Sequence, residues 1–358
     1  MSIGLGIIGT GAIGNIHADA ARRNGVRIAG AWDVLPERAV DCCQRVGGKG
    51  TGDLAELLAM KDVTAVAIAV PNDRHAECAI AALAAGKHVL LEKPMAITVA
   101  QCDSVLAAQQ RAGTVLQVGF VCRGAPTANA ARGMVSEGRL GEVYHLKVAL
   151  YRRRGIPGLG GWFTQQRHSG GGSLIDLGVH MIDLGLSLVG NPRVERASGQ
   201  AWSRFGSPIR DYVFEEMWAG PPRLDGVFDV DDGVTALLRL AKGVTMEVNI
   251  TWAANIVPGS LSDGVRLWGD RGGVAFEVFG KEVRFAGTAA GKLHDETIAV
   301  TTADPMTDMW DEQYRLFQRS IAAGRALERS GLEGRTVQCI LGAIYESSRL
   351  GREVEVPA

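Results

Sequence analysis

Two side chains four residues apart, Asp176 and His180, have the residue types of an acid–base pair. In a helix over residues 174–189, side chains at positions i and i+4 lie on the same face. An imidazole titrates near neutral pH and can take a hydroxyl proton, while a neighbouring carboxylate orients the ring and stabilises its charged form. The alternative is a surface Asp–His pair that contributes about 0.2–0.5 kcal/mol, and taken alone the pair favours that alternative.

A third reactive group, Lys93, follows a short apolar run and directly precedes Pro94. A residue before proline is held in an extended conformation, which restricts the direction of its side chain. An ammonium group there can bind a substrate hydroxyl and stabilise the alkoxide-like oxygen as a hydride leaves. The alternative is a lysine in a surface turn, where most lysines are found. The Glu92-Lys93-Pro94 context at a strand end favours the reactive role.

A glycine loop near the N-terminus matches the pattern G-x-G-x-x-G, with the residues Gly9, Thr10, Gly11, Ala12, Ile13 and Gly14. The loop follows a predicted strand and opens a predicted helix, as in dinucleotide-binding folds. The first glycine permits a tight turn, the second lets the backbone approach a pyrophosphate, and the third lets the helix pack closely on the strand. The diphosphate would then lie on N–H groups at the positive end of the helix dipole. Plain turn glycines are the alternative.

An acidic residue, Asp33, follows Gly14 by 19 residues at the end of the next predicted strand. This is the position expected to accept hydrogen bonds from an adenosine ribose. A carboxylate there repels a 2′-phosphate, and the following Val34 and Leu35 offer no cation. We therefore expect NAD rather than NADP as the cofactor, although Arg38, one turn into the next helix, keeps NADP open.

Strand-like and helix-like segments alternate through the first 120 residues. Short runs rich in Val and Ile predict buried parallel strands, at residues 4–8, 27–32, 65–70, 89–91 and 115–118. Alanine-rich stretches with charges at helical spacing predict helices between them, at residues 12–23, 36–46, 74–85 and 99–112. This repetition predicts an α/β Rossmann domain with a doubly wound parallel sheet.

The pattern changes after about residue 140. Residues 244–252 alternate strictly between apolar and polar, which indicates a strand with one face on a core. Further strands are expected at residues 145–151, 234–240, 265–268, 274–279 and 282–285, and helices at 174–189, 309–323 and 336–350. We therefore predict an NAD(P)-binding domain over residues 1–122. Residues 123–358 should form an α+β domain with a largely antiparallel, open-faced sheet that binds substrate and forms oligomers.

Three patches carry a family resemblance when they are taken together with the glycine loop. They are Val70-Pro71-Asn72-Asp73-Arg74-His75, Leu91-Glu92-Lys93-Pro94, and the segment from Gly170 to His180 that contains Asp-x-Gly-x-His. In this order they resemble the Gfo/Idh/MocA family of sugar and inositol oxidoreductases, over nearly the whole chain. The resemblance implies that Lys93, Asp176 and His180 form the catalytic group, with His180 as the acid–base. It also implies a cis Lys93–Pro94 bond.

Further cofactor contacts are expected at the carboxyl ends of the strands, where open α/β sheets bind their ligands. The candidates there are Pro71, Asn72, His75, Glu92 and Lys93. For His75, a role at the N-terminus of a helix is an equal alternative. His17 and Asp183 are expected to be structural or to support other residues.

Arg152 and Trp162 are the candidates for substrate binding beside Lys93, Asp176 and His180. The indole could stack on a sugar ring, and one arginine of the run 152–154 could grip hydroxyls or a carboxylate. For at least two of these three arginines, a solvated or subunit-facing position is the better expectation. No cluster with metal-ligand spacing is visible, and the family needs no metal for hydride transfer.

Composition narrows the function classes. The chain has 358 residues and a formal net charge of -1, which gives no reason to expect a nucleic-acid partner. Its 47 glycines are about 13% of the residues, against a usual value near 7%.

No uninterrupted apolar run is long enough for a membrane span, and the N-terminus lacks the basic lead-in of a signal peptide. The six cysteines form no C-x-x-C pair, so a reduced, cytoplasmic protein is expected.

These features favour an NAD-dependent enzyme that moves a hydride between nicotinamide and a secondary hydroxyl of a cyclic polyol, sugar or glycoside. One alternative is redox-neutral, NAD-assisted cleavage of a glycoside through a transient keto-sugar. A non-enzymatic, NAD-sensing regulator is a second alternative, but it has no need for both Lys93 and His180. The polar face of the 244–252 strand has no obvious cover within the chain. We therefore expect a homodimer or homotetramer.

Overall fold

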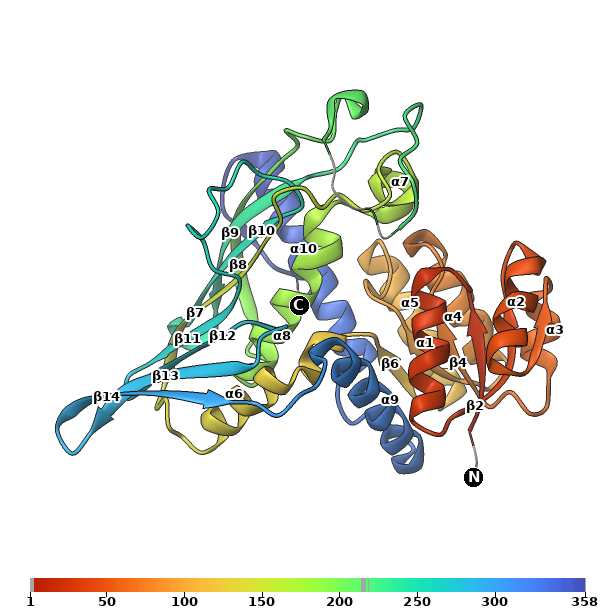
Figure 1. The fold of residues 1–358 in the computed structure, drawn as a ribbon, viewed down its shortest axis with the longest axis horizontal. Coiled ribbons are helices and arrows are strands. Elements are labelled where there is room, and N and C mark those ends of the chain that lie inside the picture. Colours follow the sequence, from red (N-terminus) through yellow and green to blue (C-terminus); the bar gives the residue numbers. More distant parts are fainter. Residues whose placement is uncertain (1–2, 214–216, 218, 358) are drawn as a thin grey trace. The chain divides into compact units, whose positions relative to one another are not determined.

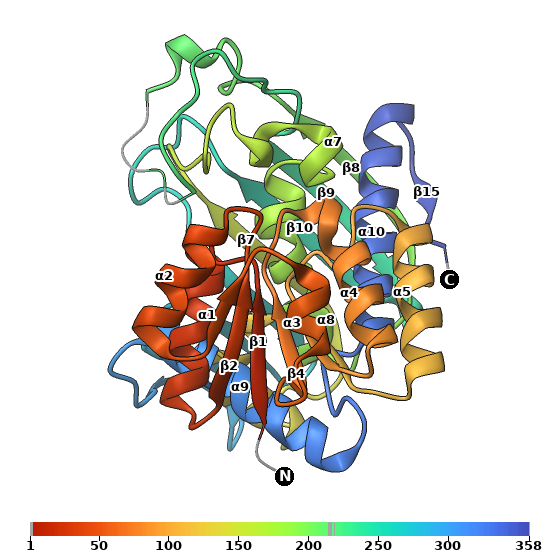
Figure 2. The same cartoon turned by 90° about the vertical axis from the view of Figure 1, so that its right-hand side faces the viewer.

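Six parallel strands in the order β3-β2-β1-β4-β5-β6 form the sheet of the N-terminal part of the chain. The computed structural model describes residues 3–213, 217 and 219–357. The strands are β1 (Gly4–Ile8), β2 (Arg27–Trp32), β3 (Lys49–Thr51), β4 (Ala65–Ile68), β5 (His88–Leu91) and β6 (Leu116–Val118). Figure 2 shows β2, β1 and β4 side by side. This strand order confirms the predicted Rossmann-type sheet.

The helices of this sheet are α1 (Ala12–Arg23), α2 (Pro36–Val46), α3 (Leu54–Ala59), α4 (His75–Ala84) and α5 (Val99–Ala112). Five predicted elements have the predicted bounds: β1, α1, β2, α2 and α5. The strand predicted over 65–70 ends at Ile68. Strand β3 and helix α3 were not predicted, because they are too short to show a hydrophobic period.

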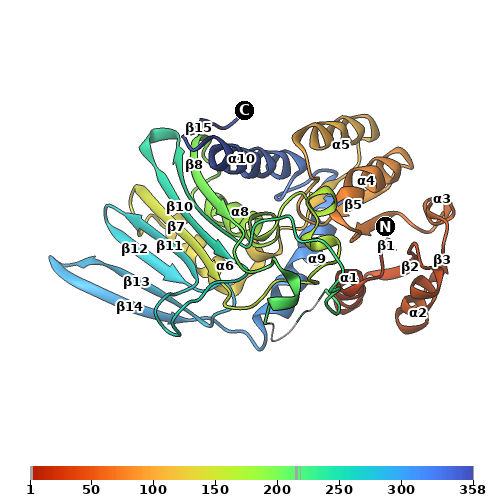
Figure 3. The same ribbon diagram turned by 90° about the horizontal axis from the view of Figure 1, so that it is seen from above.

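A nine-stranded sheet forms the core of the second part of the chain, in the order β14-β13-β12-β11-β7-β10-β9-β8-β15 (Figure 3). Its strands are β7 (Val143–Tyr151), β8 (Val194–Trp202), β9 (Gly233–Leu240), β10 (Thr245–Thr251), β11 (Gly264–Gly269), β12 (Gly272–Phe276), β13 (Glu282–Ala289), β14 (Lys292–Ala299) and β15 (Val354–Glu355). Neighbouring strands are antiparallel, except that β10 runs parallel to β7. The prediction of a largely antiparallel sheet is confirmed.

One face of this sheet is covered by helices and the other carries polar side chains. The even-numbered residues of β10, such as Met246 and Val248, are fully buried, whereas Glu247 and Asn249 are half-exposed. A Cβ added to Gly185 of α8 (Val179–Leu188) would touch Leu146, Val148 and Met246, so α8 packs directly on β7 and β10. The predicted alternation therefore marks the buried and open faces correctly.

Two further helices contact this sheet, and one of them was missed. Helix α6 (Pro126–Ser136) contacts β12 and β13 and was not predicted. Helix α10 (Gly331–Leu350) contacts β8, where a Cβ on Gly199 would meet Ile344. Strands β8, β14 and β15 were also missed.

Contacts divide the chain into two units whose boundary differs from the predicted one. The first unit contains Met1–Phe120 and Trp310–Gln338, and the second contains Val121–Met309 and Cys339–Ala358. The predicted second domain contained all of residues 123–358. The reassigned segment includes most of α9 (Pro305–Ala323), which lies below α1 in the view of Figure 1. Trp310 and Tyr314 of this helix pack against His17 of α1, which explains the assignment.

Among the described residues, no helix has both the length and the apolar character needed to cross a membrane.

Candidate active site

The glycine loop has the geometry of a pyrophosphate cradle. Gly9 has a φ of +90°, a conformation that a residue with a side chain rarely adopts. A Cβ on Gly14 would lie 1.9 Å from the carbonyl oxygen of Gly9, so α1 packs directly on the turn. A Cβ on Gly11 would meet no described heavy atom within 4 Å, and no side chain caps the start of α1. The loop therefore leaves open the space and the N–H groups that a diphosphate needs.

Asp33 ties this loop to the end of β2. Its Oδ2 accepts hydrogen bonds from the backbone N (2.8 Å) and the Oγ1 (3.1 Å) of Thr10, and its Oδ1 accepts one from the backbone N of Leu35 (3.0 Å). A carboxylate offers about four acceptor positions, so acceptor capacity remains for a ribose hydroxyl. Arg38 is exposed, and the structure shows no side-chain contact between it and Asp33. The residues present fit NAD.

Lys93 lies in a turn after β5, and the residues on either side of it, Glu92 and Pro94, are buried. The Lys93–Pro94 bond is cis, as the resemblance implied. The Glu92 carboxylate is buried: its Oε1 lies 3.0 Å from His17 Nε2, and its Oε2 accepts a hydrogen bond from the Lys93 backbone N at 3.2 Å. Glu92, a predicted cofactor residue, therefore stabilises the turn that carries Lys93.

His75 joins the ends of β4 and β5. The ring is buried, with Nδ1 2.7 Å from the carbonyl oxygen of Pro94 and Nε2 3.0 Å from that of Val70. Burial lowers the pKa of His75, and a neutral ring has one N–H, so it donates to one of these carbonyls at a time. His75 is also the first residue of α4. The structure thus favours the helix N-terminal role over contact with the nicotinamide. Nearby, Asn72 is buried and Pro71 half-buried at the start of a 3-10 turn.

Asp176 and His180 do not lie on one regular α-helix. Residues Leu174–Gly178 form a π-helical turn, and α8 begins at Val179, so His180 lies in the first turn of α8. π turns hold an extra residue per turn and are frequent at functional sites. Asp176 is buried, and its Oδ2 accepts a hydrogen bond from the Trp252 indole Nε1 at 2.9 Å. His180 is half-exposed.

A buried carboxylate that the sequence analysis missed, Asp231, holds the segment before Asp176. Its Oδ1 accepts hydrogen bonds from the Gly172 N (2.7 Å) and the Tyr345 hydroxyl (2.6 Å). Its Oδ2 accepts hydrogen bonds from the Ser173 hydroxyl (2.6 Å) and the Leu174 N (3.0 Å). Four donors on one carboxylate fix the entrance to the π turn, and we name this contact the Asp231 clamp.

The next residue, Asp232, supports the partner of Asp176. Its backbone oxygen accepts a hydrogen bond from the Trp252 N at 2.8 Å, and its Oδ2 accepts hydrogen bonds from the Arg204 N and the Phe205 N, each at 2.6 Å. Burial raises the pKa of Asp232. Asp176 is therefore supported on both sides by one acidic pair: its turn by Asp231, and its indole donor by Asp232. The one sequence signal for this pair was two adjacent acids before a strand.

The predicted substrate residues have different surroundings. The half-buried Trp162 ring packs on Phe163, with ring centroids 4.0 Å apart. Arg152 is half-buried, and its backbone N donates to the Thr251 oxygen at 3.1 Å. Asp183, predicted to be structural, forms a buried ion pair with Arg123 at 2.5 Å.

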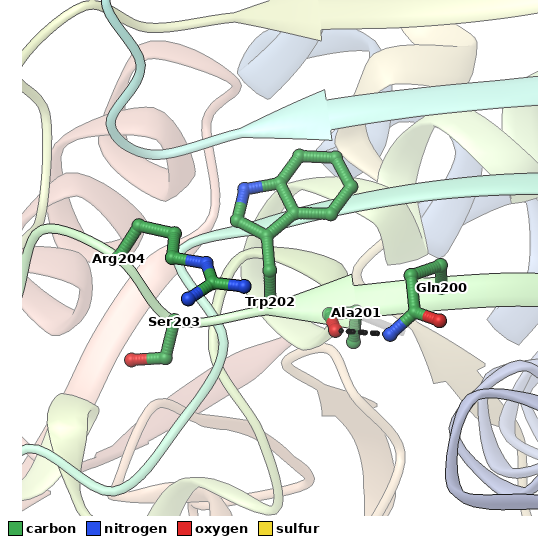
Figure 4. A pocket seen from close by; sticks show the side chains of 5 residues that line it. All are labelled: Gln200, Ala201, Trp202, Ser203 and Arg204. Carbon is green, nitrogen blue, oxygen red and sulfur yellow. Dashed lines mark hydrogen bonds between the residues drawn. The ribbon is translucent and has the colours of Figure 1, made fainter.

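A hollow of about 610 Å³ lies at the end of β8, lined by Gln200, Ala201, Trp202, Ser203 and Arg204 (Figure 4). Gln200 and Trp202 pair with Thr235 and Gly233 of β9, and Thr235 is exposed on the open face of the sheet. The hollow therefore opens on the face away from α8. It contains none of the predicted site residues.

Comparison with known proteins identifies the family. Residues 3–120 match the family model for an oxidoreductase family with an NAD-binding Rossmann fold, and residues 128–282 match that for the GFO/IDH/MocA C-terminal domain. The chain belongs to the Gfo/Idh/MocA oxidoreductase family, and residues 3–120 are its NAD-binding Rossmann domain.

Several characterised relatives are dehydrogenases. The D-glucoside 3-dehydrogenase of Escherichia coli is 28% identical over 374 residues, covering 98% of this chain and 97% of that protein. The inositol 2-dehydrogenase of Salmonella typhimurium is 32% identical over 162 residues, 44% of this chain and 48% of that protein. The solved structure of a levoglucosan dehydrogenase with NADH and levoglucosan superposes with a TM-score of 0.87 at 25% identity, and each chain is fully covered.

Two glycine substitutions should separate folding from NAD binding. Gly11→Ala should leave thermal stability unchanged and abolish NAD binding, because its Cβ enters the open space of the loop. Gly14→Ala should lower both, with a stability loss of about 1–3 kcal/mol from overpacking against Gly9. Calorimetric titration with NAD and thermal unfolding test this, with Gly133→Ala in α6 as the control. Unchanged NAD affinity in Gly11→Ala would contradict the cradle.

The Asp231 clamp predicts a local loosening in Asp231→Asn. An amide replaces one acceptor oxygen by a donor, so buried N–H or O–H groups lose their partner at a cost of about 1–3 kcal/mol each. The indole N–H of Trp252 should then exchange with solvent faster, while NAD affinity stays unchanged. NMR hydrogen exchange tests this, and the control is the same substitution at an exposed acid, Asp229→Asn, whose carboxylate accepts a hydrogen bond from the Gln166 N. Equal exchange in both variants would refute the clamp.

Proposed function

We propose that this protein is an NAD-dependent dehydrogenase that moves a hydride between nicotinamide and a secondary hydroxyl of a cyclic polyol, sugar or glycoside. The observation that carries the proposal is the buried Asp176, held by a hydrogen bond from Trp252, with His180 four residues later. The NAD-binding domain of the same chain carries Lys93 in the turn just after β5. Relatives that are named dehydrogenases of a glucoside and of inositol support this class of substrate.

The proposed roles follow from the side chains. NAD, when bound, supplies the ring that accepts a hydride from the substrate carbon. His180 takes the hydroxyl proton, and Asp176, whose carboxylate accepts a hydrogen bond from Trp252, orients and stabilises the imidazolium that forms. Lys93 donates to the same hydroxyl oxygen and stabilises its negative charge. Arg152 and the open side of Trp162 would bind the rest of the sugar.

A coupled screen tests this proposal. The protein should reduce NAD, and NADP more slowly, with at least one compound in a panel of inositols, sugars and glycosides. His180→Ala should bind NAD normally and lose turnover by about 100-fold or more, since it removes the proton acceptor. His294→Ala, at an exposed position on β14, is the control. Near-normal turnover in His180→Ala would remove His180 from the mechanism.

The screen also separates the two alternatives. Release of a free aglycone without added NAD and without net reduction would indicate redox-neutral cleavage of a glycoside. A captured protein partner together with no turnover on any compound would indicate a regulator.

We also propose that the open face of the nine-stranded sheet joins two or more copies of the chain. This face carries the half-exposed Lys147 and Glu247, which form an ion pair at 3.0 Å, and the exposed Leu237, which pairs with Glu247 across β9 and β10. Light scattering should show a dimer or tetramer at micromolar concentration, and Leu237→Asp should shift it toward monomer. A monomeric wild-type protein would refute this proposal.

A further inference from the structure

Three buried side chains from distant segments form a hydrogen-bonded chain in the first unit. His17 of α1 is fully buried, with Nδ1 3.0 Å from the Tyr314 hydroxyl and Nε2 3.0 Å from Glu92 Oε1. Tyr314 comes from α9, and Glu92 follows β5. The Trp310 and His17 rings pack edge to face, with centroids 4.9 Å apart. None of the roles proposed above uses His17 or Tyr314.

The chemistry of the three groups determines which atom donates and which accepts in each of these hydrogen bonds. Burial and the nearby Glu92 raise the pKa of Tyr314 well above its usual value, so its hydroxyl keeps its proton. An ionised carboxylate only accepts, so the Nε2–H group of His17 donates a hydrogen bond to Glu92 Oε1. The Nδ1 then accepts from the Tyr314 hydroxyl. In this arrangement every buried polar atom of the three contacts is satisfied.

The chain ends at the backbone of Lys93. The second oxygen of Glu92 accepts the Lys93 N–H at 3.2 Å, and the Pro94 oxygen lies 2.7 Å from His75 Nδ1. The Glu92 carboxylate is also tightly packed, since a Cβ on Gly119 would lie 2.7 Å from its Oε1. Buried groups thus hold the backbone on both sides of Lys93.

We propose that His17 and Tyr314 are positioning residues, which act through Glu92 to fix the turn that aims the Lys93 ammonium. This inference rests on the role proposed above for Lys93. Loss of the hydrogen bonds among Tyr314, His17 and Glu92 leaves the glycine loop intact and misplaces the Lys93 ammonium. The damage therefore falls on kcat rather than on NAD affinity, because a displacement of about 1 Å at a reacting group can cost up to 100-fold in rate.

Two substitutions at one position separate positioning from packing. In His17→Gln the amide nitrogen takes the place of Nε2 and still donates to Glu92. In His17→Asn the amide oxygen takes the place of Nδ1, accepts from Tyr314, and loses Glu92. We expect His17→Asn to lose about tenfold or more in kcat and His17→Gln to stay within about threefold of wild type. Both variants should bind NAD normally and lose similar stability.

His88→Gln is the matched control. His88 lies at the opposite end of β5, and its Nδ1 accepts one hydrogen bond, from the Val115 N at 3.1 Å. This variant should lose stability without a change in kcat. Equal kcat in His17→Asn and His17→Gln, or a kcat loss in His88→Gln that matches its stability loss, would overturn the proposal and leave His17 a packing residue.

Two measurements do not depend on turnover. Ring ¹⁵N shifts should show the Nε2–H tautomer of His17 in the wild type, and a mixture of forms in Tyr314→Phe. The acetylation rate of Lys93, mapped by mass spectrometry, should change in His17→Asn and not in His17→Gln. A wild-type protein that turns over no compound of the panel would refute the proposed function. The acetylation rates would then decide the positioning role, and identical rates in the two variants would overturn it.

Discussion

A buried carboxylate must be surrounded by hydrogen-bond donors, and this requirement organises the whole candidate site. Asp33, Glu92, Asp183 and Asp231 are all buried, and each accepts hydrogen bonds from more than one donor group or atom. Leaving one such charge without donors costs several kcal/mol, so the segments that supply the donors are held where the carboxylate needs them. Each acid therefore joins pieces of chain that the sequence keeps far apart.

In both units, buried carboxylates hold separate segments of the chain together. In the first unit, Glu92 accepts a hydrogen bond from the Lys93 N–H just after β5, and Asp33 joins the glycine loop to the end of β2. In the second unit, Asp231 fixes the π turn and Asp232 supports the indole that bonds Asp176. Two of the three proposed reactive residues, Lys93 and Asp176, lie on short irregular turns, and buried acids hold these turns by hydrogen bonds. The third, His180, lies in the first turn of α8.

Local patterns predicted most of the first unit. Proline at the start of α2, glycine after α5 and the spacing of the glycine loop gave the bounds of these elements, because each signal acts within a few residues. The π turn escaped prediction, since the spacing of Asp176 and His180 also fits an ordinary helix. His17 and Tyr314 are 297 residues apart, and Asp176 and Trp252 are 76 apart, so no local pattern could reveal either contact. His75 was predicted as a cofactor contact, with a helix N-terminal role as the alternative. Its contacts with the Pro94 and Val70 carbonyls form only in the folded protein, so no local pattern shows them.

The position of Tyr314 has a consequence for the order in which the protein is made. The chain emerges from the ribosome with its N-terminus first, and all six strands of the Rossmann sheet are available once Val118 has emerged. The helix that brings Tyr314 to His17 is synthesised nearly 200 residues later, which at ordinary elongation rates is a delay of roughly 10–40 seconds. During that interval the His17 ring lacks its hydroxyl donor and its aromatic cover. The NAD-binding unit is therefore completed only after strands β7 to β14 of the second unit have been synthesised.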